Sequence, residues 1–353
     1  MAIFQKKKKI RVAINGFGRI GRAFLKVARD RKEIEIVAVN DLADIKNIAY
    51  LLKYDTAYGI SPFSVEVGAD GKSLVIDGKS IVYVSEKEPT KLPWGTLNVD
   101  VVVESTGLFT AYDKARVHIT AGAKRVVISA PAKDVDGGAN LGATVLMGMN
   151  EAKIKEFEIT SNASCTTNAA NPLLAILDEK LGIEKALLNT VHGYTASQSL
   201  VDGPSKKDFR EGRAAAMNLV PSSTGAAIAV TKIMTHLKGS FDGVSVRVPV
   251  VTGSIVDVTF VAKRNTSADE VNLILKRAAE DTRWHGIFTV TEEPLVSSDI
   301  VGNRHASIAD LAFTRVVGGN LVKVMAWYDN EMGYTYTLVD HVIKAGEAIA
   351  PVK

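Results

Sequence analysis

The segment Ile10-Arg-Val-Ala-Ile-Asn-Gly-Phe-Gly-Arg-Ile-Gly-Arg22 decides how the chain begins to fold. Residues 10–14 are a short apolar run rich in β-branched side chains, which predicts a buried strand. The next residues match the pattern G-x-G-x-x-G at Gly16, Gly18 and Gly21, and apolar residues follow at helical spacing. A second strand is predicted at residues 34–39. Strand, glycine turn, helix and strand make a βαβ unit, in which the two strands pair in parallel.

The acidic residue Asp41 stands just after that second strand, 20 residues beyond Gly21. This context is the fingerprint of a Rossmann dinucleotide-binding domain: the glycines allow a tight turn, close approach of a pyrophosphate and tight helix packing. Asp41 would bind the adenine-ribose hydroxyls and repel the extra phosphate of NADP, so we expect NAD as the cofactor. The alternatives are a glycine turn of purely structural use and an ordinary turn aspartate.

Further apolar strands are predicted at 99–103 and 125–128, and each ends at small polar residues. Such strand ends suit a ligand crevice at the carboxyl edge of a parallel sheet. Asp70-Gly71 and Asp77-Gly78 lie between alternating segments and predict tight hairpin turns.

The pattern changes after about residue 164. A capping box at Ser267–Glu270 predicts one helix, and it lies among longer strands predicted at 244–248, 254–262, 306–313 and 321–327. We therefore expect an α/β Rossmann domain over residues 1–164 and an α+β catalytic domain with a mostly antiparallel sheet over 165–330. The C-terminal helix, 331–353, is expected to pack back on the first domain.

The composition excludes several classes of protein. The 353 residues are 46% apolar and 23% charged with a net charge of +4, and no apolar run reaches the roughly 20 residues of a membrane span. The basic run Lys6–Lys9 is expected to be a solvated leader, because neither a secretory apolar stretch nor interleaved aromatic residues accompany it. This argues against a nucleic-acid partner. The six histidines show no paired ligand spacing, so no metal site is expected.

Cys165 is the only cysteine, so the chain cannot form an internal disulfide and nothing calls for an oxidising compartment. Taken alone, a single cysteine is more typical of a small buried apolar residue than of a nucleophile. The segment Ser161-Asn-Ala-Ser-Cys-Thr-Thr-Asn168 is small and polar, however, and leads into a predicted helix at 169–177. A cysteine at a helix N-terminus has its thiolate favoured, and a nearby imidazolium would add to the effect.

This segment resembles the active-site signature of phosphorylating glyceraldehyde-3-phosphate dehydrogenases. Other motifs of that family fall in the same order from about Ile10 to the C-terminus: Asn15–Arg22, Ser129–Pro131, Val191–Thr195, Pro221–Gly225, Arg247–Pro249 and Trp327–Glu331. The resemblance implies an NAD-dependent enzyme that oxidises glyceraldehyde 3-phosphate and uses inorganic phosphate to form 1,3-bisphosphoglycerate. Cys165 would be the nucleophile that forms a hemithioacetal and then a thioester, and His192 the general base.

The resemblance also implies two anion sites. Thr195, Arg210 and Arg247 would bind the substrate's phosphate; the attacking phosphate would be bound by Ser164, Thr166, Thr224 and Gly225. For Arg210 the alternative is a solvated loop charge. Further cofactor contacts are expected at Arg19, Ile20, Lys87, Ser129 and Asn330. Lys87 stands where many relatives have arginine, and Ala169 replaces a second cysteine.

Family members are similar in forming cytoplasmic homotetramers, with the 195–213 loop near a neighbouring subunit's cofactor. The nearest rival activity is erythrose-4-phosphate dehydrogenase, whose members tend to lose the threonines that stand here as Thr195 and Thr224. A non-catalytic binding protein with the same fold is the rival from another class. The stretch 134–144 is longer and richer in glycine than the family pattern, which predicts a surface loop.

Overall fold

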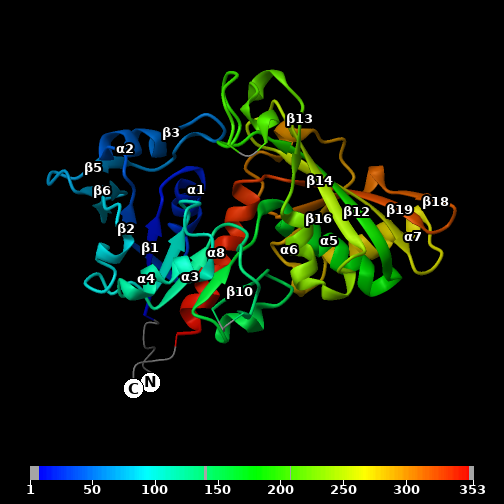
Figure 1. Ribbon diagram of the computed structural model, residues 1–353, viewed down its shortest axis with the longest axis horizontal. Coiled ribbons are helices and arrows are strands. Elements are labelled where there is room, and N and C mark those ends of the chain that lie inside the picture. Colours follow the sequence, from blue (N-terminus) through cyan, green and yellow to red (C-terminus); the bar gives the residue numbers. More distant parts are fainter. Residues whose placement is uncertain (1–7, 139–140, 207, 350–353) are drawn as a thin grey trace. The chain divides into compact units, whose positions relative to one another are not determined.

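The computed structural model describes residues 8–138, 141–206 and 208–349. They form two compact units. The first comprises the chain up to Val145, Asn150–Asn162 and the residues from Leu338 onward. The second comprises Leu146–Met149 and Ala163–Thr337, and helix α8 (Met332–Glu347, red in Figure 1) begins in the second unit and ends in the first.

The first unit is built on a sheet with nine strands in the described chain. Their order is β10 (Ala143–Thr144), β11 (Ile159–Ser161), β9 (Arg125–Ile128), β8 (Val101–Glu104), β1 (Ile10–Asn15), β2 (Ile34–Asn40), β7 (Lys79–Val84), β6 (Ser73–Ile76) and β5 (Val65–Val67). The strands from β10 to β7 pair in parallel, whereas β6 and β5 are antiparallel. The unit also contains α1 (Arg19–Ala28), α2 (Ile45–Lys53), α3 (Tyr112–Ala115), α4 (Val117–Thr120) and the two-stranded β3 (Tyr54–Asp55) with β4 (Gly59–Ile60).

The predicted βαβ unit is confirmed in β1, α1 and β2, which lie together in Figure 1. Val12, Ala13 and Ile14 are fully buried because β1 lies in the middle of the sheet, between β2 and β8. The turn between β6 and β7 is also as predicted: Asp77 and Gly78 both have positive φ, 47° and 75°. Two successive residues with positive φ are typical of a tight hairpin turn.

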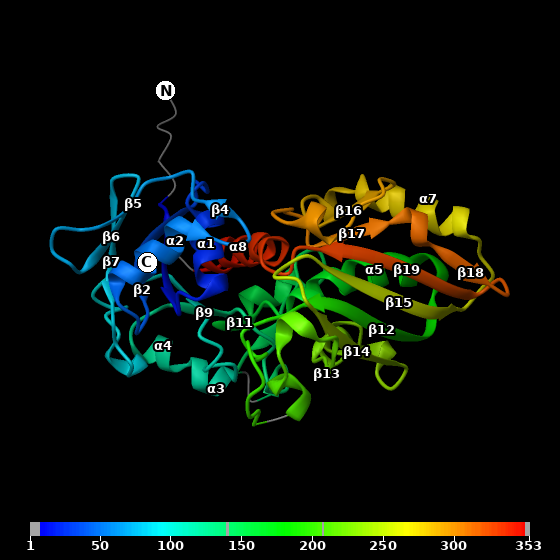
Figure 2. The same ribbon diagram turned by 90° about the horizontal axis from the view of Figure 1, so that it is seen from above.

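The second unit contains an eight-stranded sheet, again counting described residues only. Its order is β13 (Val220–Ser223), β14 (Phe241–Val248), β12 (Ile183–Gly193), β15 (Ser254–Ala262), β19 (Leu321–Tyr328), β17 (Ser307–Asp310) and β16 (Phe288–Thr291), with β18 (Arg315–Val317) paired to β19. Only β12 with β14 and β16 with β17 pair in parallel. Figure 2 shows β12, β15 and β19 side by side.

Buried and partly exposed side chains alternate along the strands of this second sheet, as expected for a sheet with one covered face. Every second residue of β15 is buried, from Ser254 to Ala262. The long helix α5 (Cys165–Leu181), with most of its residues buried, packs against β15, β17 and β19. The unit also contains helices α6 (Ala226–Ile233) and α7 (Ala268–Ala279). The observed fold is therefore an α/β unit followed by an α+β unit with a mostly antiparallel sheet, as the sequence predicted.

Some local predictions were wrong or incomplete. The strand predicted at 306–313 ends at Asp310, because the Asp310 side chain accepts a hydrogen bond from the Ala312 amide (3.2 Å) and caps a 3₁₀ turn. The capping box of α7 is half formed: Ser267 accepts from the Glu270 amide (3.2 Å), but the Glu270 carboxylate binds Arg264 instead of the Ser267 amide. Strand β12 was missed altogether.

Three predicted features lie partly outside the described residues: the basic run, the stretch 134–144 and the C-terminal helix at 331–353. Within the basic run, Lys8 and Lys9 are described, and both are exposed. The stretch 134–144 is described except at 139 and 140, and it ends in the short strand β10. The C-terminal helix α8 ends at Glu347.

Candidate active site

The glycine loop of the first unit has the geometry that a dinucleotide requires. Gly16 has φ +90°, and a Cβ atom placed there would lie 2.7 Å from the Thr106 backbone nitrogen, so no larger residue fits. A Cβ atom at Gly18 would meet nothing within 4 Å, so the space outside this residue is open to a ligand. Helix α1 begins at the next residue, and no side chain caps its N-terminus. Uncapped amides at a helix N-terminus suit a phosphate group.

Asp41 lies directly beyond the end of β2, beside this loop. Its Oδ2 atom accepts the Phe17 amide (2.7 Å), and its Oδ1 atom accepts the Ala43 amide (3.0 Å). These two bonds fix the orientation of the carboxylate at the strand end. The loop and Asp41 together fit a dinucleotide whose adenine ribose has free hydroxyls.

The other cofactor residues predicted in the first unit have different surroundings. Arg19 forms an ion pair with the nearly buried Asp55 (2.9 Å), and this pairing lowers the pKa of Asp55 although burial opposes it. Ile20 lies in the first turn of α1, and Ser129 follows the end of β9. Lys87 is exposed in the segment after β7. The structure thus brings the three glycines of the loop and Asp41 together. Arg19 and Ile20 lie in α1, and Lys87 and Ser129 follow the C-terminal ends of β7 and β9.

Cys165 is the first residue of α5 in the second unit. Ser164 is the N-cap, and its hydroxyl accepts the Thr167 amide (3.1 Å). Ala163, just before it, has φ +55°, a backbone conformation that is strained for a residue with a side chain. The chain thus turns sharply to present the cysteine at the positive end of a long buried helix.

His192 lies opposite this sulfur. It is the tenth residue of β12, nearly buried, and its Nε2 atom is 3.3 Å from Cys165 Sγ. The ring of Tyr328 packs edge-on against the imidazole, with 5.9 Å between ring centroids. The Tyr328 hydroxyl is hydrogen-bonded to Thr190 (2.7 Å) and Thr166 (3.0 Å), so the ring is fixed in turn.

Arg247 reaches the same imidazole from the neighbouring strand. His192 and Arg247 are register partners on the parallel strands β12 and β14. Arg247 Nη1 is 2.6 Å from His192 Nδ1, and the Gly193 carbonyl oxygen is 2.7 Å from the same nitrogen. A guanidinium has only donors, so the first contact requires an unprotonated Nδ1, whereas donation to Gly193 requires a protonated one. The two contacts therefore belong to different tautomers of His192.

The electrostatics of the pair differ from the expectation of a thiolate beside an imidazolium. Burial raises the pKa of Cys165, although Arg247 and the amides at the start of α5 lower it. Burial and Arg247 lower the pKa of His192 to about 3. The expected helix N-terminus is present, but the expected imidazolium is not, and desolvation of the sulfur outweighs the helix amides and Arg247. In the protein alone, a thiol faces a neutral imidazole.

The residues predicted to bind anions lie at two helix N-termini, on strand β14 and in the segment after β12. Ser164 and Thr166 lie in the first turn of α5 and its cap, and Thr224 and Gly225 lie just before α6. Arg247 Nε is buried and has no hydrogen-bond partner within the described chain. Thr195 is hydrogen-bonded to Ser197 (3.0 Å). Arg210 is exposed and pairs with Asp208 (2.8 Å), so the structure gives it no contact with the cysteine.

Asn330 has a side chain that is held from one side. Its Oδ1 atom accepts the Ser254 hydroxyl (2.8 Å) and the Gly253 amide (3.2 Å). Ser254 also accepts the amide of Gly193, the residue after His192 (3.1 Å). Tyr328, Thr190 and Ser254 were all missed by sequence reasoning, because their contacts join strands far apart in the chain; the motif at 327–331 was the only signal.

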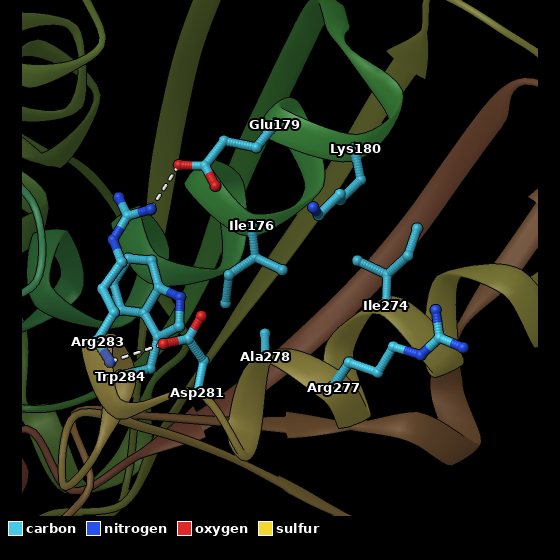
Figure 3. Close-up of a pocket in the computed structure, with 9 residues that line it drawn as sticks. All are labelled: Ile176, Glu179, Lys180, Ile274, Arg277, Ala278, Asp281, Arg283 and Trp284. Carbon is cyan, nitrogen blue, oxygen red and sulfur yellow. Dashed lines mark hydrogen bonds and ion pairs between the residues drawn. The ribbon is translucent and has the colours of Figure 1, made fainter.

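A separate cavity of about 300 Å³ lies in the second unit beside the later turns of α5 and α7. Figure 3 shows Arg283 reaching Glu179 along its wall, with an N–O distance of 2.7 Å. None of the predicted site residues lines it. Within the described residues no cluster of His, Cys, Asp or Glu could hold a metal ion, and no helix there is long and apolar enough to span a bilayer.

Comparison with known proteins covers both units. A family model described as the NAD binding domain of glyceraldehyde 3-phosphate dehydrogenase matches residues 10–112, and one described as its C-terminal domain matches 164–330. Glyceraldehyde-3-phosphate dehydrogenase 2 of Streptomyces avermitilis is 47% identical over 343 residues, which are 96% of this chain and 99% of that protein. The Mycobacterium avium enzyme is 47% identical over 348 residues (96% and 99%), and glyceraldehyde-3-phosphate dehydrogenase 1 of Bacillus subtilis is 46% identical over 333 residues (94% and 96%).

Proposed function

The chain belongs to the glyceraldehyde-3-phosphate dehydrogenase family, and from this premise we propose that it oxidises glyceraldehyde 3-phosphate with NAD and inorganic phosphate to 1,3-bisphosphoglycerate. The observation that carries the proposal is the pair of Cys165 Sγ and His192 Nε2, 3.3 Å apart at the start of α5. A sulfur nucleophile beside a base can split the oxidation and the phosphorylation into two feasible steps.

In the first step Cys165 adds to the aldehyde carbon. The S–C bond forms as the thiol proton leaves for His192, which can accept it at Nε2 when Nδ1 donates to the Gly193 carbonyl (2.7 Å). The imidazolium then protonates the aldehyde oxygen, which gives a hemithioacetal. Because the pKa of His192 is lowered to about 3, the imidazole returns to the neutral form and is ready to act as a base again.

In the second step His192 takes the hemithioacetal hydroxyl proton as the C–H bond breaks, and a thioester on Cys165 results. Bound NAD supplies the acceptor for the hydride. Inorganic phosphate then attacks the thioester carbon, the S–C bond breaks, and the sulfur regains a proton from His192, which took one from the hydroxyl. Arg247 is placed to stabilise negative oxygen atoms during these steps, because its buried Nε donor has no hydrogen-bond partner within the described residues.

The two phosphates are proposed to bind around this pair. Arg247 offers a buried Nε donor without a partner in the described chain, and arginine binds phosphate through parallel hydrogen bonds. We assign Thr195, Arg210 and Arg247 to the substrate's phosphate; the attacking phosphate is assigned to Ser164, Thr166, Thr224 and Gly225. Arg210 must exchange its pairing with Asp208 for the substrate, which its exposure allows.

The cofactor is NAD, which the family's dinucleotide-binding domain takes. We propose that the loop of Gly16, Gly18 and Gly21 receives the pyrophosphate and that Asp41 binds the adenine ribose. Asn330 is proposed to donate its amide hydrogens to the nicotinamide, since its carbonyl oxygen is already committed to Ser254 and Gly253. Further contacts are proposed at Arg19, Ile20, Lys87 and Ser129.

The working protein is proposed to be a cytoplasmic homotetramer. The segment 195–219 exposes several large apolar side chains, which suit contact with a second copy: Leu200, Val201, Phe209, Met217 and Leu219. A single reduced cysteine at the proposed reaction centre suits a reducing compartment.

Phosphate dependence tests the proposed reaction. With glyceraldehyde 3-phosphate and NAD, sustained NADH formation should require phosphate or arsenate, and Cys165→Ser should abolish it. Rapid NADH formation without either anion would instead indicate hydrolysis to the free acid, as in erythrose-4-phosphate dehydrogenases. If Cys165→Ser leaves every activity and binding property unchanged, the protein is a binding module and the proposal is wrong.

A further inference from the structure

Tyr83 lies beside the turn that carries Asp41, although the two residues are far apart in sequence. Strands β2 and β7 pair in parallel, with Val39 opposite Tyr83, and the Asp41 amide donates to the Val84 carbonyl (3.1 Å). The Tyr83 hydroxyl oxygen is 2.6 Å from the Ala43 carbonyl oxygen and 3.1 Å from that of Asp41. A hydroxyl has a single proton, so the Ala43 carbonyl is the main acceptor and the Asp41 carbonyl the weaker one. One side chain thus fastens both ends of the turn to a neighbouring strand.

The turn determines where the Asp41 carboxylate points. Its Oδ1 atom accepts the Ala43 amide within the turn (3.0 Å), and its Oδ2 atom accepts the Phe17 amide of the glycine loop (2.7 Å). On the far side of the turn, Asp44 caps α2 through the Lys46 amide (2.8 Å). If residues 41–43 shift, the carboxylate must shift with them.

We infer that Tyr83 is a positioning residue for cofactor selectivity, acting through the Asp41 turn. The inference rests on the proposed binding of the adenine ribose by Asp41. With the turn fastened, NAD meets a carboxylate that is already oriented, whereas the 2′-phosphate of NADP meets a negative charge that cannot move aside. The Tyr83 hydroxyl acts through the backbone of the turn, to which it donates, and is not assigned a contact with the cofactor.

The hydroxyl keeps its proton over the physiological pH range. Burial and the carboxylates of Asp41 and Asp44 raise the pKa of Tyr83 to about 12. The donor to the turn is therefore present at every pH at which the enzyme would work.

The variant Tyr83→Phe tests this, because it keeps the ring and removes only the hydroxyl. We expect the NAD dissociation constant, measured by calorimetry, to rise about fivefold, which is the effect of one ordinary hydrogen bond. NADP should bind no more weakly than before, because the conformations that the loosened turn gains are those that tolerate the extra phosphate. Without any cofactor, the Ala43 amide should exchange its hydrogen faster. The value of kcat and the KM for the aldehyde should not change.

Tyr50→Phe is the matched control, since Tyr50 is an exposed tyrosine on α2 in the same unit and should leave both dissociation constants unchanged. The inference is overturned if Tyr83→Phe alters neither constant, or if it weakens NAD and NADP equally, as general loosening of the unit would do. Failure of the unmodified protein to bind NAD would be a different result, because it would contradict the proposed function and not merely the role of Tyr83.

Discussion

At the scale of single residues, the reactive centre is defined by a sulfur, an imidazole and a guanidinium. The sequence indicated Cys165 because the cysteine precedes a predicted helix, but it could not indicate how Arg247 affects it. That contact arises because β12 and β14 pair in register across 55 residues of chain. Arg247 lowers the pKa of both partners: it favours the thiolate of Cys165 and disfavours the imidazolium of His192.

Replacing Arg247 by methionine should therefore change the reactivity of the thiol. Without the guanidinium the pKa of Cys165 should rise further, so iodoacetamide labelling at pH 8 should become slower. The measurement is the labelling rate as a function of pH for the protein without ligands. Arg210→Met is the control, because Arg210 pairs with Asp208 and should leave the profile in place. Identical profiles for Arg247→Met and the unmodified protein would contradict this account of the site.

At the scale of elements, the sequence predicted what local pattern determines. The βαβ unit follows from a strand, a glycine turn and a helix that are adjacent in the chain. Strand β12 was missed, although it carries His192, because its partners β14 and β15 come much later in the sequence. The hydrogen bonds of Tyr83 could not be predicted either, since they join the end of β7 to the turn that follows β2.

Glu104 illustrates how the elements around the glycine loop are joined. It ends β8 and is 1% exposed, and its Oε2 atom accepts hydrogen bonds from Asn15 (2.6 Å) and His118 (2.8 Å). Trp94 donates to the other nitrogen of His118 (3.2 Å), which leaves the His118 proton on the side facing Glu104. The Oε1 atom accepts the Thr106 amide (2.8 Å), so both carboxylate oxygens face donors.

Glu104→Gln should destabilise the first unit, because either orientation of the amide places its NH₂ group against another donor. We expect a loss of about 2 kcal/mol in the free energy of unfolding, the cost of an unsatisfied buried group, measured with urea. Glu35→Gln is the matched control: Glu35 forms an ion pair with Arg11 (3.2 Å) and is half exposed, so its loss should cost roughly 0.5 kcal/mol or less. Equal stability of the two variants would show that the buried network contributes nothing.

At the scale of the whole molecule, each unit contains a buried histidine that stays neutral. Burial lowers the pKa of His192 in the second unit and of His341 in the first to about 3. His341 Nδ1 lies 3.1 Å from Asn162 Oδ1, and its Nε2 lies 2.8 Å from the Thr160 hydroxyl. In the unfolded chain both histidines should titrate near 6.5.

The stability of the protein should therefore fall in acid. Between pH 6.5 and about 3 the unfolded chain binds protons that the folded chain does not, so the free energy of unfolding decreases as the pH is lowered. Each histidine should contribute about 1.4 kcal/mol per pH unit. Chemical denaturation at pH 7, 6 and 5 measures how the free energy of unfolding depends on pH. His341→Gln should remove the contribution of His341 to this dependence. A stability that is flat from pH 7 to pH 5 would be inconsistent with two buried neutral histidines.

The proposed reaction requires Cys165 to carry the substrate as a thioester before phosphate releases it. Intact-protein and peptide mass spectrometry should be performed after mixing the protein with NAD and glyceraldehyde 3-phosphate in phosphate-free buffer. We expect one phosphoglyceroyl group per chain on Cys165, and we expect it to disappear when phosphate is added. NADH formation with an unmodified Cys165, or an acyl group on any other residue, would contradict it.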